Sequence, residues 1–229
     1  MNIPQPAVAL ARRQLHFIWL IDCSGSMTVN GKIQAVNSAI NETLPEMLKV
    51  AAANPEVQVM VRAVTFASGA QWHVSQSTPL EDFRWQPVSA SGVTDMGRAF
   101  RLVADYLGTV SGRNLPPVLV LMSDGAATDD VSGGLQALLN EPWGKKAVRL
   151  SVAIGDDADL DMLQKFMSYP EMPPLRAGNP EQLVQQIKWA STAALVASSK
   201  LSHNSGNPQM PPLPMPPPPD PGNAGSWVF

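Results

Sequence analysis

A short apolar run that ends abruptly at a carboxylate constrains this chain more than any other feature. Residues 15–21 are mainly apolar, and Asp22 follows them directly. A run of this length that is bounded by a turn signal predicts a strand buried on both faces. Such strands belong to parallel sheets with helices on both sides, and ligands bind these sheets beyond the carboxyl ends of the strands. The residues after the run are therefore the first candidates for a functional site.

The rest of the chain alternates strand-like and helix-like patterns, as a doubly wound α/β domain does. Residues 57–66 alternate and are rich in β-branched residues, and residues 71–77 are typical of an antiparallel edge strand that pairs with them. We therefore predict a mostly parallel sheet with one antiparallel edge strand. Further strands are expected at 118–122, 147–154 and 173–176, and helices at 31–53, 95–109, 131–140, 159–168 and 180–199.

These patterns divide the chain into three parts. Residues 1–13 are expected to form an irregular N-terminal arm, and residues 14–200 form one domain. Residues 201–229 are rich in proline and contain no Lys, Arg or Glu, although they end in Trp-Val-Phe. Such a tail cannot bury a core of its own, so it is expected to be extended or disordered.

The composition argues against nucleic-acid binding, a disulfide or cysteine zinc site, and a membrane or secreted location. The formal net charge is -3, so no basic field favours nucleic acid. Cys23 is the only cysteine, which excludes a disulfide within the chain and a cysteine-based zinc site. The sequence contains no apolar run long enough to predict a membrane span, and the N-terminal residues lack the pattern of a signal peptide. The cytoplasm is the expected location.

Polar side chains follow two of the predicted strands and precede one helix. Asp22, Ser24 and Ser26 follow the first strand, Asp124 follows a later apolar strand, and Thr94 stands where a helix N-cap belongs. If the two strands are neighbours, Asp22 and Asp124 meet at the edge of the sheet. Carboxylate and hydroxyl oxygens suit hard cations such as Mg²⁺. The sequence therefore predicts a divalent-metal site, although each carboxylate could instead serve only a turn or helix terminus, and Thr94 only a cap.

The five positions resemble the metal-ion-dependent adhesion site of von Willebrand factor A (VWA) domains. The family combines Asp-x-Ser-x-Ser with a Thr from a later loop and an Asp after a later strand, which here are Asp22, Ser24, Ser26, Thr94 and Asp124. The resemblance implies a Rossmann-like fold and a bound Mg²⁺, or Mn²⁺ or Ca²⁺. It also implies a protein-binding module without catalysis, in which the partner supplies an Asp or Glu to the metal.

Among bacterial members, the chain looks most like the TerY-type proteins associated with tellurium resistance. The similarity lies in the short N-terminal lead-in, the chain length and the segment LPPVLVLMSDGAATDD at 115–130. This resemblance implies a docking or scaffolding role in a bacterial stress-signalling system, together with a PP2C-type phosphatase and a protein kinase.

Two other functions remain open at this point. Other bacterial members of the family act as accessories of AAA ATPase chaperones. A phosphoryl-transfer enzyme could instead use Asp22 as a nucleophile, but such enzymes need a second carboxylate at the position of Ser24. No lysine placed to neutralise a transferring phosphoryl group is evident either. The chain also lacks a P-loop, a dinucleotide-binding glycine motif and a nucleophile elbow.

Overall fold

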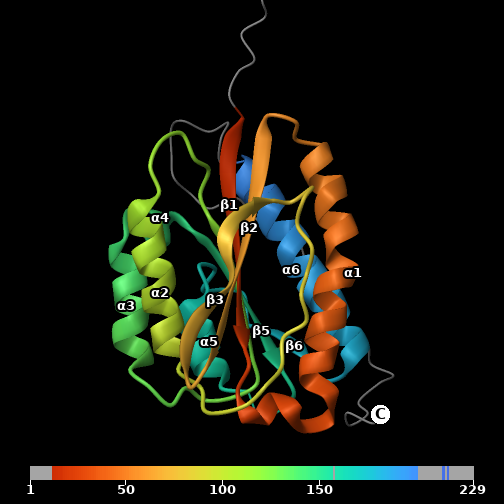
Figure 1. Cartoon of the computed structure of the whole chain (residues 1–229), viewed down its shortest axis with the longest axis vertical. Helices are drawn as coiled ribbons and strands as arrows, with labels where there is room; N and C mark the ends of the chain where they lie inside the picture. Colours follow the sequence, from red (N-terminus) through yellow and green to blue (C-terminus); the bar gives the residue numbers. More distant parts are fainter. Residues whose placement is uncertain (1–11, 157, 201–212, 215, 217–229) are drawn as a thin grey trace, which may run out of the picture.

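A six-stranded sheet forms the centre of the computed structural model, which describes residues 12–156, 158–200, 213, 214 and 216 (Figure 1). The strand order is β3-β2-β1-β4-β5-β6. All neighbouring strands run parallel except β2 and β3, which are antiparallel. The strands are β1 (Arg13–Asp22), β2 (Val57–Ala67), β3 (Gly69–Pro79), β4 (Val118–Ser123), β5 (Val148–Ile154) and β6 (Leu175–Ala177). The predicted doubly wound α/β fold with an antiparallel edge strand is confirmed.

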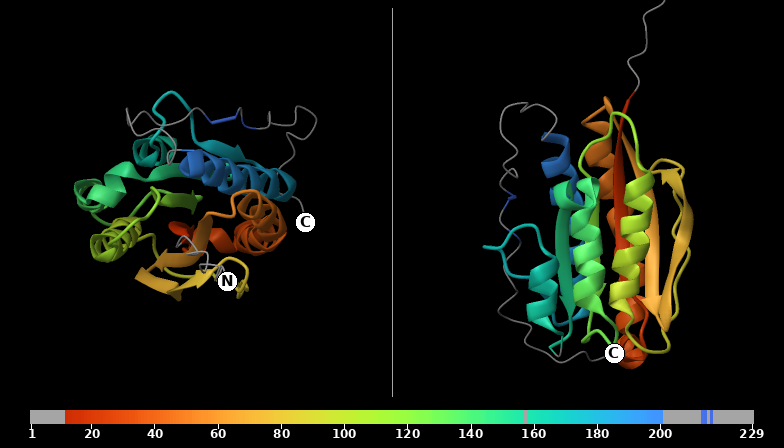
Figure 2. Two further views of the ribbon diagram at one scale, coloured as in Figure 1. Left: turned by 90° about the horizontal axis from the view of Figure 1, so that it is seen from above. Right: turned by 90° about the vertical axis from the view of Figure 1, so that its left-hand side faces the viewer.

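Helices cover both faces of this sheet (Figures 1 and 2). One face carries α1 and α6, and the other carries α2, α3 and α5. The helices are η1 (Gly25–Gly31), α1 (Lys32–Ala52), α2 (Met96–Thr109), α3 (Val131–Asn140), α4 (Pro142–Lys146), α5 (Leu160–Phe166) and α6 (Pro180–Lys200).

The apolar run of β1 is explained by these two layers. Successive side chains of a strand point to opposite faces, so Trp19 and Ile21 enter the core beneath α1 and α6. Ile18 and Leu20 enter the core beneath α2 and α5. Each of these four side chains is fully buried, and each such burial stabilises the fold by roughly 1.5–3 kcal/mol.

Two local features differ from the sequence prediction. The helix expected at 31–53 begins as α1 at Lys32, and the 3-10 helix η1 precedes it across left-handed backbone at Asn30 and Gly31. The short helix α4 was not predicted, because five residues are too few to show a helical apolar period.

The predicted N-terminal arm and proline-rich tail lie almost entirely outside the described residues. Leu213 is an exception, because it is partly buried and packs against the core beneath α1 and α6. No helix in the described part of the chain is both long and apolar enough to cross a lipid bilayer.

Candidate metal centre

The turn after β1 is clamped between two other segments of the chain. Cys23 N donates to Phe66 O at the end of β2, at 2.8 Å, and Gly25 N donates to Gly92 O at 2.9 Å. A Cβ atom at Gly25 would lie 3.2 Å from Gly92 O, so this close approach favours glycine. The turn is therefore positioned by β2 and by the loop around Gly92, as well as by β1.

Four of the five predicted ligands meet at the point where the strand order reverses. Ser24 Oγ lies 3.0 Å from Ser26 Oγ, and Ser26 Oγ donates to Asp124 Oδ1 at 2.7 Å. Asp22 Oδ1 accepts from Ser24 N at 2.8 Å. Because β1 and β4 are adjacent and parallel, both Asp22 and Asp124 stand at one edge of the sheet. The predicted meeting of the two carboxylates is thus observed.

Both carboxylates are fully buried, whereas Ser26 is exposed. Asp22 Oδ2 accepts a 2.6 Å hydrogen bond from Ser123 Oγ, a contact that sequence reasoning missed because Ser123 is the last residue of β4. Burial raises the pKa of the Asp22 carboxyl above its ordinary value, and the charge of Asp124 adds to this rise. Hydrogen bonds from Ser123 and Ser24 oppose it. A nearby cation would therefore favour the ionised form of Asp22.

Thr94 lies in a loop that reaches the same edge of the sheet, but it does not cap α2. The helix begins at Met96 with Asp95 as its N-cap. The first free backbone N–H groups of α2, those of Gly97 and Arg98, donate instead to the Asp129 carboxylate, both at 2.8 Å. The N-cap prediction is therefore wrong, because a carboxylate from another loop serves this helix terminus.

The described contacts of Thr94 are made by its backbone. Its N–H donates to Thr128 Oγ1 at 3.1 Å, and its carbonyl accepts from Thr128 N at 2.9 Å. The neighbouring Asp95 N donates to Ala67 O at the end of β2, at 2.9 Å. These bonds hold the buried Thr94 near the edge that carries Asp22.

Lys32, the first residue of α1, also enters the site. Its Nζ lies 2.7 Å from Asp124 Oδ2, and the two side chains are 6% and 0% exposed. No lysine was evident at the site from the sequence, and the structure places Lys32 there. Its place in the first turn of the helix after Asp-x-Ser-x-Ser puts it near the strand ends, but the sequence does not indicate which carboxylate it contacts. Ser24 still occupies the position where phosphoryl-transfer enzymes need a carboxylate, so Lys32 adds little support to the hypothesis of a phosphoryl-transfer enzyme.

The donor set fits a hard divalent cation. Asp22, Asp124, Ser24 and Ser26 offer only oxygen atoms, which Mg²⁺, Mn²⁺ and Ca²⁺ prefer. Within the described residues, no three His, Cys, Asp or Glu side chains gather closely enough to hold a metal. A metal at this edge would therefore depend on the hydroxyl groups. Cys23 packs into the core, and burial raises the pKa of its thiol to about 12, so it offers no thiolate.

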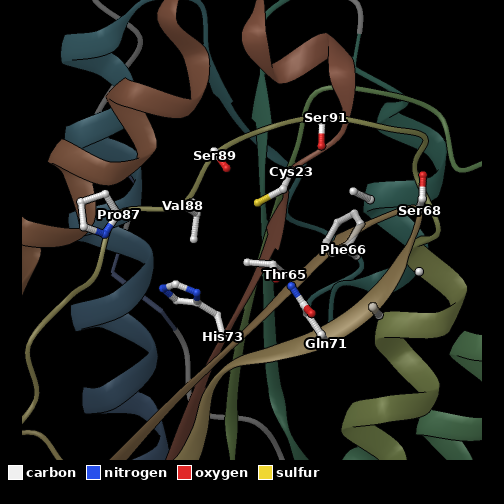
Figure 3. A pocket seen from close by; sticks show the side chains of 13 residues that line it. Cys23, Thr65, Phe66, Ser68, Gln71, His73, Pro87, Val88, Ser89 and Ser91 are labelled. Atoms are coloured by element: carbon white, nitrogen blue, oxygen red, sulfur yellow. The ribbon is translucent and has the colours of Figure 1, made fainter.

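A hollow of ≈ 430 Å³ opens beside the turn, between the β2–β3 hairpin and the loop at 87–91 (Figure 3). We call it the side hollow; its lining includes Cys23, Gln71, His73 and Ser91. None of its lining residues is Asp, Glu, Lys or Arg. Ser91 N donates to Cys23 O at 2.7 Å, so the side hollow adjoins the proposed ligands directly.

A family model matches the part of the chain that carries the proposed site. The von Willebrand factor type A domain model matches residues 17–126, a stretch that includes all five predicted ligands. The match and the fold support a VWA domain. No curated protein sequence matches the chain.

Several solved structures have a fold similar to that of this chain. A von Willebrand factor type A protein from Catenulispora acidiphila is 17% identical, with a TM-score of 0.61, over 80% of this chain and 43% of that one. The ArnB paralog VWA2 from Sulfolobus acidocaldarius is 15% identical, with a TM-score of 0.58, over 78% of this chain and 45% of that one.

A third similar structure is proximal thread matrix protein 1 from the mussel byssus, in a form whose MIDAS motif is occupied by zinc. It is 15% identical, with a TM-score of 0.61, over 79% of this chain and 48% of that one. The chain thus spans less than half the length of each of these three structures. At such identities the similarity concerns the fold.

Proposed function

We propose that this chain is a metal-dependent, non-catalytic module that docks another protein. The observation that carries the proposal is the hydrogen-bonded group of Asp22, Ser24, Ser26 and Asp124 at the switch point of the sheet. Thr94 would complete the ligand set from its loop. Mg²⁺ is the proposed ion, with Mn²⁺ or Ca²⁺ as substitutes.

The balance of charge supports docking. Ser24 and Ser26 would contribute neutral oxygens, so only Asp22 and Asp124 would offset the positive charge of an ion. When bound, the ion would supply that charge and an open coordination position. A partner's Asp or Glu fits such a position, and the exposed Ser26 marks the side from which the partner would approach. The zinc-occupied motif of the byssus protein supports the view that this fold can hold a divalent ion.

The side hollow extends the proposed docking face. It adjoins Cys23 in the site turn, so residues next to the partner's acidic group would lie over it. Because its lining carries no formal charge from Asp, Glu, Lys or Arg, it would accept polar or small apolar side chains.

For the cellular role, we propose a TerY-type scaffold in a cytoplasmic stress or tellurite-resistance system, with a PP2C-type phosphatase and a protein kinase as partners. The support is the sequence resemblance at 115–130. The alternative is an accessory protein of an AAA ATPase chaperone. The identity of captured partners separates the two, because a phosphatase or kinase would favour the first and an ATPase the second.

Capture of partners with and without chelator tests the docking proposal. The full chain with an affinity tag serves as bait in extracts of cells that express it, in Mg²⁺ or in EDTA. Asp22→Asn should abolish Mg²⁺-dependent capture, whereas Asp105→Asn, on the exposed surface of α2, should not. Equal capture in Mg²⁺ and EDTA would exclude metal-dependent docking.

A further inference from the structure

The ion pair between Lys32 and Asp124 gives the proposed site a cation of its own. The two atoms Nζ and Oδ2 lie 2.7 Å apart, and both side chains are almost completely buried. The other oxygen of Asp124 accepts from Ser26 Oγ at 2.7 Å. One carboxylate therefore links an ammonium group to a proposed metal ligand.

The charges of the site differ with and without this lysine. The formal charges of Asp22, Asp124 and Lys32 sum to one negative charge, whereas those of the two carboxylates alone would sum to two. A divalent ion would bring the first set to one positive charge and the second set to neutrality. Because all three side chains are buried, solvent screens these charges weakly.

We propose that Lys32 is a resident counter-cation that lowers the affinity of the site for divalent metal and stabilises the metal-free form. The inference rests on the proposed metal binding. Lys32 offsets the charge of Asp124 when no metal is present, and it repels the metal when one arrives. It also leaves the loaded site with a net positive charge, which favours an acidic partner.

The packing of α1 argues that the ammonium group is not required to anchor the helix. Ile33, Val36 and Ile40 are buried on the same helix and pack into the core. A methionine or glutamine at position 32 would occupy similar space. The charge of Lys32 can therefore be removed with little change in the shape of the side chain.

The test measures Mg²⁺ and Mn²⁺ binding to the full chain by isothermal titration calorimetry, with thermal unfolding in EDTA and in Mg²⁺. Lys32→Gln removes the charge and keeps a donor for Asp124, and Lys32→Met removes both. Lys32→Arg keeps the charge. Lys49→Gln is the control, because Lys49 lies on the same helix with a side chain that is 72% exposed.

Lys32→Gln should bind Mg²⁺ more tightly by about tenfold or more, since even water-like screening leaves a sizeable repulsion between a unit charge and a nearby divalent ion. It should unfold at a lower temperature than the unaltered chain in EDTA and recover in Mg²⁺. Lys32→Arg and Lys49→Gln should bind as the unaltered chain does. Neutral variants that fold only in Mg²⁺ also support the inference.

Unchanged or weaker metal binding by Lys32→Gln overturns the inference while the docking function stands. Neutral variants that fold in neither condition also overturn it, because Lys32 would then be a structural support that metal cannot replace. If only the neutral variants bind metal, the inference holds and metal-dependent docking by the unaltered chain fails. If no variant binds metal, both fail.

Discussion

Ser26 Oγ donates a 2.7 Å hydrogen bond to Asp124 Oδ1, across 98 positions of the chain. This bond joins the turn after β1 to the end of β4, and it aligns an exposed hydroxyl with a buried carboxylate. Both groups are proposed ligands of one ion, so a change at either should alter metal binding through the other.

Ser26→Ala should weaken Mg²⁺ binding by at least about tenfold, because it removes a ligand and the hydrogen bond that orients Asp124. The fold should change little, since Ser26 is exposed. Calorimetry measures the affinity, and Ser38→Ala, on the exposed surface of α1, is the matched control. Equal affinity for both variants would remove Ser26 from the ligand set.

The hydrogen bond from Ser123 Oγ to Asp22 Oδ2 should contribute to stability. Ser123→Ala leaves a buried carboxylate oxygen without this donor, so the free energy of unfolding should fall by about 1.5–3 kcal/mol. Ser151→Ala is the control, because Ser151 is equally buried but donates to the neutral carbonyl of Leu163. It should lower the free energy of unfolding by about 0.5–1.5 kcal/mol. Urea unfolding measures both, and a larger loss at Ser151 would contradict this account.

Alanine usually stabilises a helix relative to glycine, but where α2 packs closely against α3 a Gly→Ala substitution should destabilise the protein. A Cβ atom at Gly134 would lie 2.3 Å from Gly97 O, so Gly134→Ala should lower the free energy of unfolding by about 1–3 kcal/mol. Gly108→Ala, in α2, meets only the flexible end of Glu141 at 3.2 Å and should raise it by up to about 1 kcal/mol. Thermal unfolding compares the two, and a gain in stability for Gly134→Ala would refute the packing argument.

Stability should fall as the pH drops below about 6.5, in part through His16. Burial lowers the pKa of His16 from its ordinary value of 6.5, so as the pH falls the unfolded chain binds a proton before the folded chain does. The free energy of unfolding should therefore decline from pH 6.5 down to the folded-state pKa. Above pH 6.5, His16 should make no contribution to the pH dependence of stability. In urea unfolding at several pH values, His16→Asn should show a shallower decline, and an unchanged slope would exclude this role.

The sequence was sufficient to predict the sheet and the meeting of Asp22 with Asp124. The apolar run before Asp22 indicates a buried parallel strand, and the topology of such sheets then places the two strand ends together. Lys32 and Asp129 could not be placed in the same way. Lys32 pairs with Asp124 across 92 positions, and Asp129 caps α2 from a separate loop. Contacts of this kind depend on helix orientation and loop path, which leave no periodic signal in the sequence.

The most direct test of the account is anomalous diffraction from crystals soaked in Mn²⁺. We predict a single strong anomalous peak at the switch point, bonded to the hydroxyl oxygens of Ser24 and Ser26 and adjacent to Asp22, Thr94 and Asp124. Absence of a peak there at saturating Mn²⁺, or Thr94 and Asp124 turned away from the ion, would contradict the central claim.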